Sequence, residues 1–138
     1  MKKFTEIDHT ADIAFKVFGK NIETLFENAA IALYAHINDT GNIKEKRSFY
    51  VFAEGTDQDE LLINWLNELN FLTSTKNYIF CKFSIIELSN KFVKAEVKGE
   101  KINKLRHGPT REIKSVTYYK NVIKTIDKHI ECDIYCDT

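Results

Sequence analysis

Two polar groups near the two ends of the chain carry the side chains best suited to bind a metal ion. Residues 8–12 (DHTAD) form the densest polar run between two predicted strands. The sequence finishes with Asp137 and Thr138, so a side-chain carboxylate and a main-chain carboxylate stand one residue apart. If the last strand lies beside the strand that begins at Ile13, Asp12 converges with both groups. Three carboxylates in one place repel one another unless a cation binds, and oxygen donors favour Ca²⁺ or Mg²⁺.

Residues 8–12 also have a purely structural interpretation. In chain bends, Asp and Thr side chains commonly hydrogen-bond to nearby backbone groups. We expect Asp8 and His9 to hold the bend, with His9 able to fix a ligand carboxylate as a hydrogen-bond donor. The predicted metal ligands are Asp12, Asp137 and the terminal carboxylate of Thr138.

A second polar segment, residues 99–112, is predicted to be a loop of about fourteen residues. Positions 98–114 contain six Lys or Arg residues against two Glu residues. Long loops are often functional, so a solvated flexible loop and a partner- or phosphate-binding loop both stay open. We expect Lys101, Lys104, Arg106, His107 and Arg111 to face solvent and to move more than the flanking strands. The candidate partner-binding residues are Lys104, Arg106, His107, Arg111 and Lys114.

Other familiar site patterns are absent from the sequence. The four histidines form no HxxxH pattern and the three cysteines, Cys81, Cys132 and Cys136, form no CxxC pair, so the spacings typical of zinc sites are missing. No GxSxG, GxGxxG or GxxxxGK[ST] motif occurs either. We therefore expect no catalytic nucleophile, and we expect free, mostly buried thiols in a reducing compartment.

Composition favours one ordinary globular domain over residues 1–138. Hydrophobic residues make up 43% of the chain, charged residues 29%, and the formal net charge is zero. A general nucleic-acid coat protein would carry a basic surplus, so this composition speaks against that class. Because the sequence contains no apolar run of about 20 residues and no cleavable signal pattern, we expect a soluble, cytoplasmic protein.

Two amphipathic helices are predicted to position these groups, at residues 22–37 and 58–73. In the first, Leu25, Phe26, Ala29 and Leu33 follow the spacing of one buried stripe, and Asn21 is the expected N-cap. The second begins after Asp57, with Glu60 three residues later as in a capping box. Its stripe includes Trp65, which we interpret as a core residue.

The remaining apolar runs alternate as strands do. They are expected near residues 13–18, 49–53, 78–88, 92–97, 113–119, 122–126 and 130–136, with a tight turn at Asp127 and Lys128. Short turns between neighbouring runs favour antiparallel pairing. The predicted fold class is therefore α+β, a single domain with two helices packed on an antiparallel or mixed sheet.

Several of these segments together resemble the archease family. The matching segments, in the order of the family, are 8–12 (DHTAD), 25–30 (LFENAA), 63–69 (INWLNEL), 99–100 (GE), 106–107 (RH) and 112–119 (EIKSVTYY). The resemblance covers essentially the whole chain, which also ends in Asp plus one residue as archeases do.

The resemblance implies an accessory protein of the RtcB-type RNA ligase. That ligase joins RNA ends in tRNA splicing and RNA repair, uses GTP and a divalent metal, and passes through a guanylylated histidine. Archeases promote this guanylylation and multiple turnover and do not perform the ligation. By the same resemblance, Asp12, Asp137 and Thr138 are the metal ligands, the ligase is the protein partner, and RNA is met through the ligase.

Two alternatives from other classes stay open at this stage. The acidic residues are also compatible with a stand-alone metal-dependent phosphohydrolase or nuclease, although no general base or nucleophile is spaced for that chemistry. A direct tRNA-binding module would rest on residues 101–114 alone.

Overall fold

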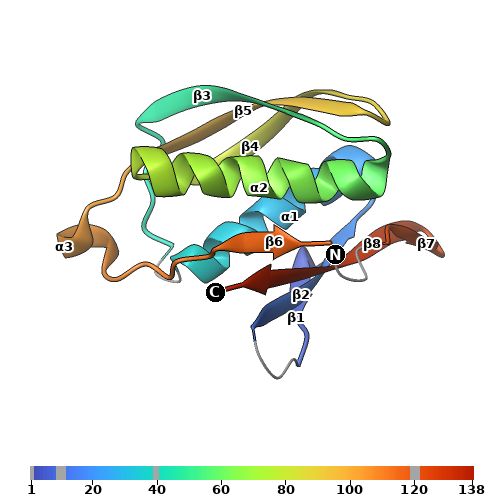
Figure 1. The fold of residues 1–138 in the computed structure, drawn as a ribbon, viewed down its shortest axis with the longest axis horizontal. Coiled ribbons are helices and arrows are strands. Elements are labelled where there is room, and N and C mark those ends of the chain that lie inside the picture. Colours follow the sequence, from blue (N-terminus) through green and yellow to red (C-terminus); the bar gives the residue numbers. More distant parts are fainter. Residues whose placement is uncertain (1, 9–11, 39–40, 119–121) are drawn as a thin grey trace.

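Two antiparallel sheets enclose the two long helices between them (Figure 1). This arrangement comes from a computed structural model, which describes residues 2–8, 12–38, 41–118 and 122–138. The helices are α1 (Ile22–Ile37), α2 (Gln58–Lys76) and the short α3 (Lys104–His107). The strands are β1 (Phe4–Glu6), β2 (Ile13–Gly19), β3 (Arg47–Glu54), β4 (Tyr78–Leu88), β5 (Phe92–Lys101), β6 (Ser115–Thr117), β7 (Lys124–Ile126) and β8 (His129–Asp137).

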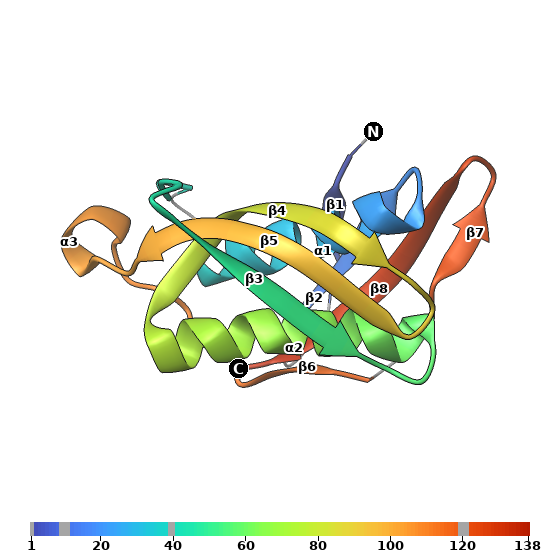
Figure 2. The same ribbon diagram turned by 90° about the horizontal axis from the view of Figure 1, so that it is seen from above.

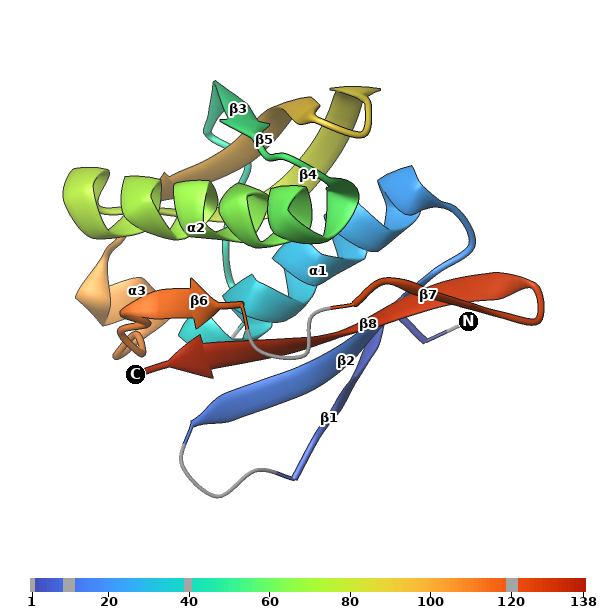
Figure 3. The same ribbon diagram turned by 45° about the vertical axis from the view of Figure 1, so that its right-hand side comes forward.

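Strand order divides the chain into a three-stranded and a five-stranded sheet. The three-stranded sheet has the order β3-β5-β4 and lies across α1 and α2 when seen from above (Figure 2). The other sheet has the order β1-β2-β8-β6, with β7 also paired to β8, and lies on the opposite side of the helices (Figure 3). Every pairing is antiparallel, which confirms the α+β class, with two sheets instead of the single sheet expected.

Local sequence signals explain where the two long helices begin. The Asn21 side chain accepts a hydrogen bond from the Thr24 backbone N–H at 2.8 Å, so α1 begins where its cap predicts. The Asp57 side chain accepts from the Glu60 N–H, and the Glu60 carboxylate accepts from the N–H of Thr56. This is a capping box whose return bond reaches one residue further back. α2 continues three residues beyond the predicted end, to Lys76.

Both helices are buried on more than one side because each packs on both sheets. α1 contacts β2 and β4, and α2 contacts β3 and β6. Trp65 is fully buried, as expected for a core residue, and its indole N–H donates to the carbonyl of Phe26 at 3.0 Å. The hydrogen bond satisfies the single polar group of this large side chain and fixes α2 against α1. No helix in the described ranges is long and apolar enough to span a membrane.

The segment between β5 and β6 differs from the predicted loop. Residues 99–101 extend β5, and residues 104–107 form the helical turn α3. In the described part of the strand predicted at 113–119, only Ser115–Thr117 pairs with β8, and residue 119 lies outside the described residues. The Asp127–Lys128 turn is confirmed, and Asp127 adopts a positive φ of 54°.

Gly99 is required by the close approach of β4 to β5. A Cβ atom at this position would lie 1.9 Å from the carbonyl oxygen of Ile79, beside the register shift between Phe80 and Lys82. The three nearest atoms all belong to the backbone of β4, so none of them can turn away as a flexible side chain could. The glycine therefore permits the irregular pairing that brings the start of β4 against the end of β5.

We predict that Gly99→Ala lowers the free energy of unfolding by about 3 kcal/mol, because backbone atoms must move to admit the methyl group. Urea denaturation measures the change. Ser48→Ala, at an exposed position of β3, is the control and should stay within about 0.5 kcal/mol of the parent protein. Parent-like stability of the Gly99→Ala protein would contradict this account of the sheet.

Candidate functional site

The pairing of β2 with β8 brings the two predicted acidic segments together. Ile13 pairs with Cys136, so Asp12 and Asp137 follow at the same end of the ladder. The Thr138 backbone N–H and hydroxyl both donate towards Asp12 Oδ1, at 3.4 and 3.3 Å. We call Asp12, Asp137 and Thr138 the acidic corner. Its members are half-buried or exposed, as a site open to an ion or a partner must be.

Strand β6 holds the far side of the acidic corner. Ser115 pairs with Asp137 in the ladder, and its hydroxyl donates to Asp137 Oδ2 at 3.4 Å. The Lys114 N–H donates to the carbonyl of Asp137 at 2.9 Å. β6 therefore fixes the backbone of Asp137, while this residue stays exposed.

Three asparagines of α2 hold β6 in place. The Asn67 side chain accepts from the Val116 N–H at 2.8 Å and donates to the Val116 carbonyl at 2.9 Å. Asn70 donates to the carbonyl of Ile113 at 2.7 Å, and Asn64 accepts from the hydroxyl of Tyr118. The two Asn67 bonds take the place of a neighbouring strand along the outer edge of β6, and the other two fix residues before and after it.

Sequence reasoning missed this asparagine row. Its signal is the spacing of three residues between Asn64, Asn67 and Asn70, which lines up amide side chains along one side of α2. Such side chains can bond to both the N–H and the C=O of a passing backbone.

The donors at the acidic corner fit a hard cation. In the described ranges, no Lys, Arg or His side chain forms an ion pair with Asp12 or Asp137. The neighbouring Cys136 is buried. Burial is the main cause that raises the pKa of its thiol to about 12, and the charges of Asp137 and Asp12 add to the rise, so Cys136 stays a neutral thiol. All available donors are then oxygen atoms, which suit Ca²⁺ or Mg²⁺.

The third predicted ligand, the terminal carboxylate of Thr138, stays a prediction. No three His, Cys, Asp or Glu side chains gather as metal ligands within the part of the chain that the structure describes. A three-carboxylate site therefore requires the α-carboxylate of Thr138 beside Asp12 and Asp137. Asp8 is exposed, and the predicted roles of His9 and its neighbours to Ala11 lie outside the described residues.

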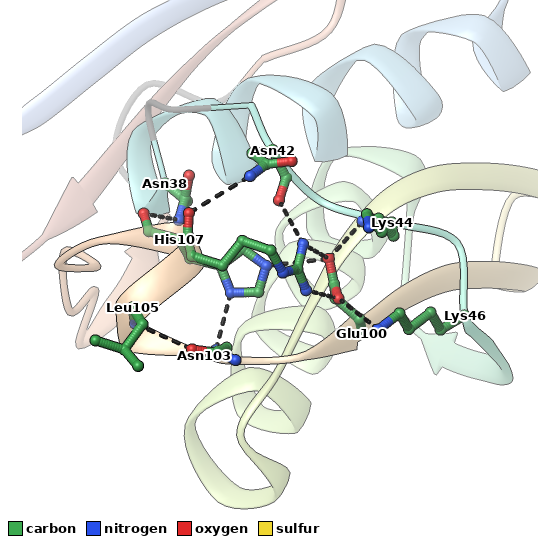
Figure 4. Close-up of polar contacts among 9 residues, drawn as sticks. Asn38, Asn42, Lys44, Lys46, Glu100, Asn103, Leu105 and His107 are labelled. Atoms are coloured by element: carbon green, nitrogen blue, oxygen red, sulfur yellow. Dashed lines mark hydrogen bonds and ion pairs between the residues drawn. The ribbon is translucent and has the colours of Figure 1, made fainter.

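The basic segment contains a buried carboxylate that sequence reasoning did not identify (Figure 4). Glu100 is 2% exposed, and it accepts hydrogen bonds from the Lys44 backbone N–H, from both terminal nitrogens of Arg106 and from His107. The Arg106 guanidinium is the largest cause that lowers the pKa of Glu100, from 4.5 to about 2, against the opposing effect of burial. Glu100 is therefore a charged structural anchor for α3.

The hydrogen bonds of His107 define which ring nitrogen carries its proton. Its Nδ1 accepts from the Asn103 backbone N–H at 2.9 Å, so the proton resides on Nε2, which donates to Glu100 at 3.0 Å. The ring is completely buried, and the His107 carbonyl accepts from the Asn38 side chain at 3.1 Å. These contacts close residues 103–107 against α1 and β5.

The expectation that all five basic residues face solvent is wrong for two of them. His107 is buried, and Arg106 is half-buried against Glu100, because a carboxylate within reach makes their burial favourable. Lys101, Lys104 and Arg111 are exposed as expected, and so is the partner-binding candidate Lys114. The Arg111 N–H donates to the carbonyl of Ile37 at 2.8 Å, so even this stretch is tied to the end of α1.

Comparison with known proteins identifies the family. The model of the Archease protein family matches residues 4–138. The chain belongs to the archease family. It is 36% identical to an archease of Methanosarcina mazei over 121 residues, which cover 85% of this chain and 83% of that protein. It is 33% identical to an archease of Sulfolobus acidocaldarius over 128 residues, 92% of each chain.

Solved structures agree with the family assignment. A solution structure of a Methanobacterium thermoautotrophicum protein matches all of both chains with a TM-score of 0.80 and 31% identity. A Thermotoga maritima structure, described as an archease and possible chaperone, covers 97% of this chain and 96% of its own, with a TM-score of 0.67 and 20% identity. At that identity, the second likeness shows the archease fold alone.

We predict that Asn67→Ala lowers the free energy of unfolding by about 2 kcal/mol, because it leaves both backbone groups of Val116 without their partner. Thermal and urea denaturation measure the loss. Ser74→Ala is the control, since Ser74 is exposed on α2 and bonds only within its own helix. Equal stability of the two variants would show that α2 does not hold β6 through these bonds.

Glu100→Gln should destabilise the protein by about 3 kcal/mol at neutral pH, because Arg106 and His107 lose a buried charged partner. The lowered pKa of Glu100 stabilises the fold above 4.5, and this contribution disappears as pH falls towards about 2. The difference between parent and variant should therefore shrink over that range. Urea denaturation at several pH values, with exposed Glu87→Gln as the control, measures it. A difference independent of pH would contradict the assignment.

Proposed function

We propose that this archease is an accessory protein of a GTP- and metal-dependent RtcB-type RNA ligase in tRNA splicing and RNA repair. It promotes guanylylation and multiple turnover of the ligase and does not perform the ligation. Membership of the family supports this role, and the position of Asp12 against Thr138 at the acidic corner is the observation that carries it. The description of a Thermotoga family member as a possible chaperone agrees with a non-catalytic assisting role.

In this proposal, Asp12, Asp137 and the α-carboxylate of Thr138 bind a divalent cation, Ca²⁺ or Mg²⁺. Ca²⁺ takes about six to eight oxygen ligands and Mg²⁺ about six, so three carboxylates leave positions open. Water fills these positions in the free protein. A divalent cation held by these residues would supply positive charge to oxygen atoms of the ligase or its nucleotide.

Exposed basic side chains of residues 104–114 extend the proposed contact surface. Lys114 immediately precedes the strand that holds Asp137, and its N–H is bonded to the Asp137 carbonyl. Lys104 and Arg111 are also exposed and can form charge-assisted hydrogen bonds with the ligase. Arg106 and His107 act indirectly, because their side chains are engaged with Glu100.

The cytosol is the proposed compartment of this activity. Cys81, Cys132 and Cys136 are all free thiols. Burial is the main cause that raises the pKa of Cys132 and Cys136 to about 12, which keeps both thiols unreactive. Free thiols suit a reducing environment.

The test is Asp12→Asn in a multiple-turnover ligation assay with the cognate ligase. We expect stimulation to fall roughly tenfold or more, because a metal ligand loses its charge. Calcium titration by calorimetry should show the same loss of affinity. Folding should persist, since the only hydrogen bonds of Asp12 in the described ranges are the long ones from Thr138.

Asp127→Asn is the matched control, because it makes the same chemical change in the turn between β7 and β8. Removal of Thr138 moves the α-carboxylate onto residue 137 and should impair stimulation without altering either aspartate. Full stimulation by the Asp12→Asn protein would overturn the metal role. RNA cleavage by the purified protein with Mg²⁺ alone would instead favour a hydrolase, and salt-sensitive RNA binding would favour a tRNA-binding module.

A further inference from the structure

A basic pocket lies at the end of the three-stranded sheet, next to α3. Its volume is about 550 Å³, within the range of small-molecule sites. The pocket includes Lys46, Arg47 and Tyr78, which are far in sequence from the polar segment 99–112. The side chains that line it include Lys46, Arg47, Tyr78, Glu100, Lys101 and Arg106.

Sheet register places three of these side chains on one face. Arg47 of β3 pairs with Gly99 of β5, and Tyr78 of β4 pairs with Lys101 of β5. Paired residues of antiparallel strands point to the same side, and so do residues two apart on one strand. Arg47, Tyr78 and Lys101 therefore converge from three different strands, and Gly99 between them contributes no side chain.

The pocket carries an excess of positive charge. Four cationic side chains line it against the single carboxylate of Glu100. Glu100 is already occupied by Arg106, His107 and the Lys44 N–H. Lys46 approaches it only to 3.9 Å and remains 62% exposed. Neither Arg47 nor Lys101 forms an ion pair with any residue in the described ranges, so their charges are available to a ligand.

Arg47 is held in position before any ligand arrives. Its Nη1 donates to the Tyr78 hydroxyl at 2.8 Å. Its guanidinium carbon lies 5.6 Å from the ring centroids of both Phe49 and Tyr78. These contacts restrict the long side chain and leave the remaining N–H donors of the planar group for an anion, so less conformational entropy is lost on binding.

We propose that the basic pocket binds a phosphate group that carries two or more negative charges, as a phosphomonoester or a polyphosphate does. The planar donors of Arg47 match phosphate oxygens, and Lys101 and Lys46 add positive charge to the pocket. A concave pocket with concentrated charge suits a compact anion better than it suits the extended backbone of a duplex. Two sources supply this chemistry, a free nucleoside triphosphate and the phosphorylated end of an RNA strand.

Tripolyphosphate is the first probe, titrated into the full chain and followed by calorimetry and NMR chemical shifts. We expect saturable binding that Arg47→Gln and Lys101→Gln each weaken roughly tenfold or more. Arg47→Lys retains the charge and should still weaken binding, because the planar pair of donors is lost. Lys82→Gln is the matched control, since Lys82 is an exposed lysine of β4 outside the pocket, and it should leave affinity unchanged.

Absence of saturable binding, or equal weakening by Lys82→Gln, would overturn the proposal, because either result reduces the pocket to general surface charge. GTP and a short RNA, with and without a 3′-phosphate, then identify the source. Tighter binding of GTP supports a nucleotide site, and preference for the phosphorylated RNA supports a site for RNA ends. No GTP binding together with equal binding of the two RNAs would also overturn it. None of these measurements needs the ligase or the acidic corner.

Discussion

The antiparallel pairing of β2 with β8 is the interaction on which both ends of the chain depend. Its ladder runs from Ile13–Cys136 to Gly19–Ile130, so residues more than a hundred positions apart become neighbours. Closing so long a loop costs only slightly more entropy than closing a shorter one, because the cost grows with the logarithm of length. The burial of three apolar side chains in this ladder offsets that entropic cost. They are Phe15, Val17 and Ile134, all 0% exposed. β8 also pairs with β6 and β7, so this one strand organises the whole five-stranded sheet.

Sequence reasoning succeeded where the information is local. The bounds of α1 follow from a stripe of apolar residues and from Asn21, whose side chain caps the helix as its type predicts. The Asp127–Lys128 turn likewise follows from two adjacent residues, and it pairs β7 with β8. The acidic corner needed one assumption beyond local signals, that the strands of Asp12 and Asp137 are neighbours. That pairing is present, while the role of these residues as metal ligands stays a prediction.

The failures concern polar side chains whose partners come from distant segments. The charges of residues 99–112 are visible in the sequence and predict a solvated loop. The burial of Glu100 cannot be seen in the sequence. Burial of this carboxylate is favourable only when Arg106, His107 and the Lys44 N–H surround it, and those groups meet only in the folded chain. The length of strand β6 was overestimated for a related reason. Its outer edge bonds to Asn67 of α2, so alternation alone did not define its length.

α2 links the acidic corner to the basic pocket through hydrogen bonds at several points along its length. Asn67 and Asn70 hold the segment that leads into β6, and β6 in turn holds Asp137. At the end of the same helix, the carbonyl of Asn77 accepts from the Ile102 N–H at 2.8 Å, directly after Lys101. α2, which Trp65 fixes in the core, therefore supports segments of both sites. A partner that engages both sites would therefore meet backbone segments that one packed helix already holds, which lowers the entropy lost on binding.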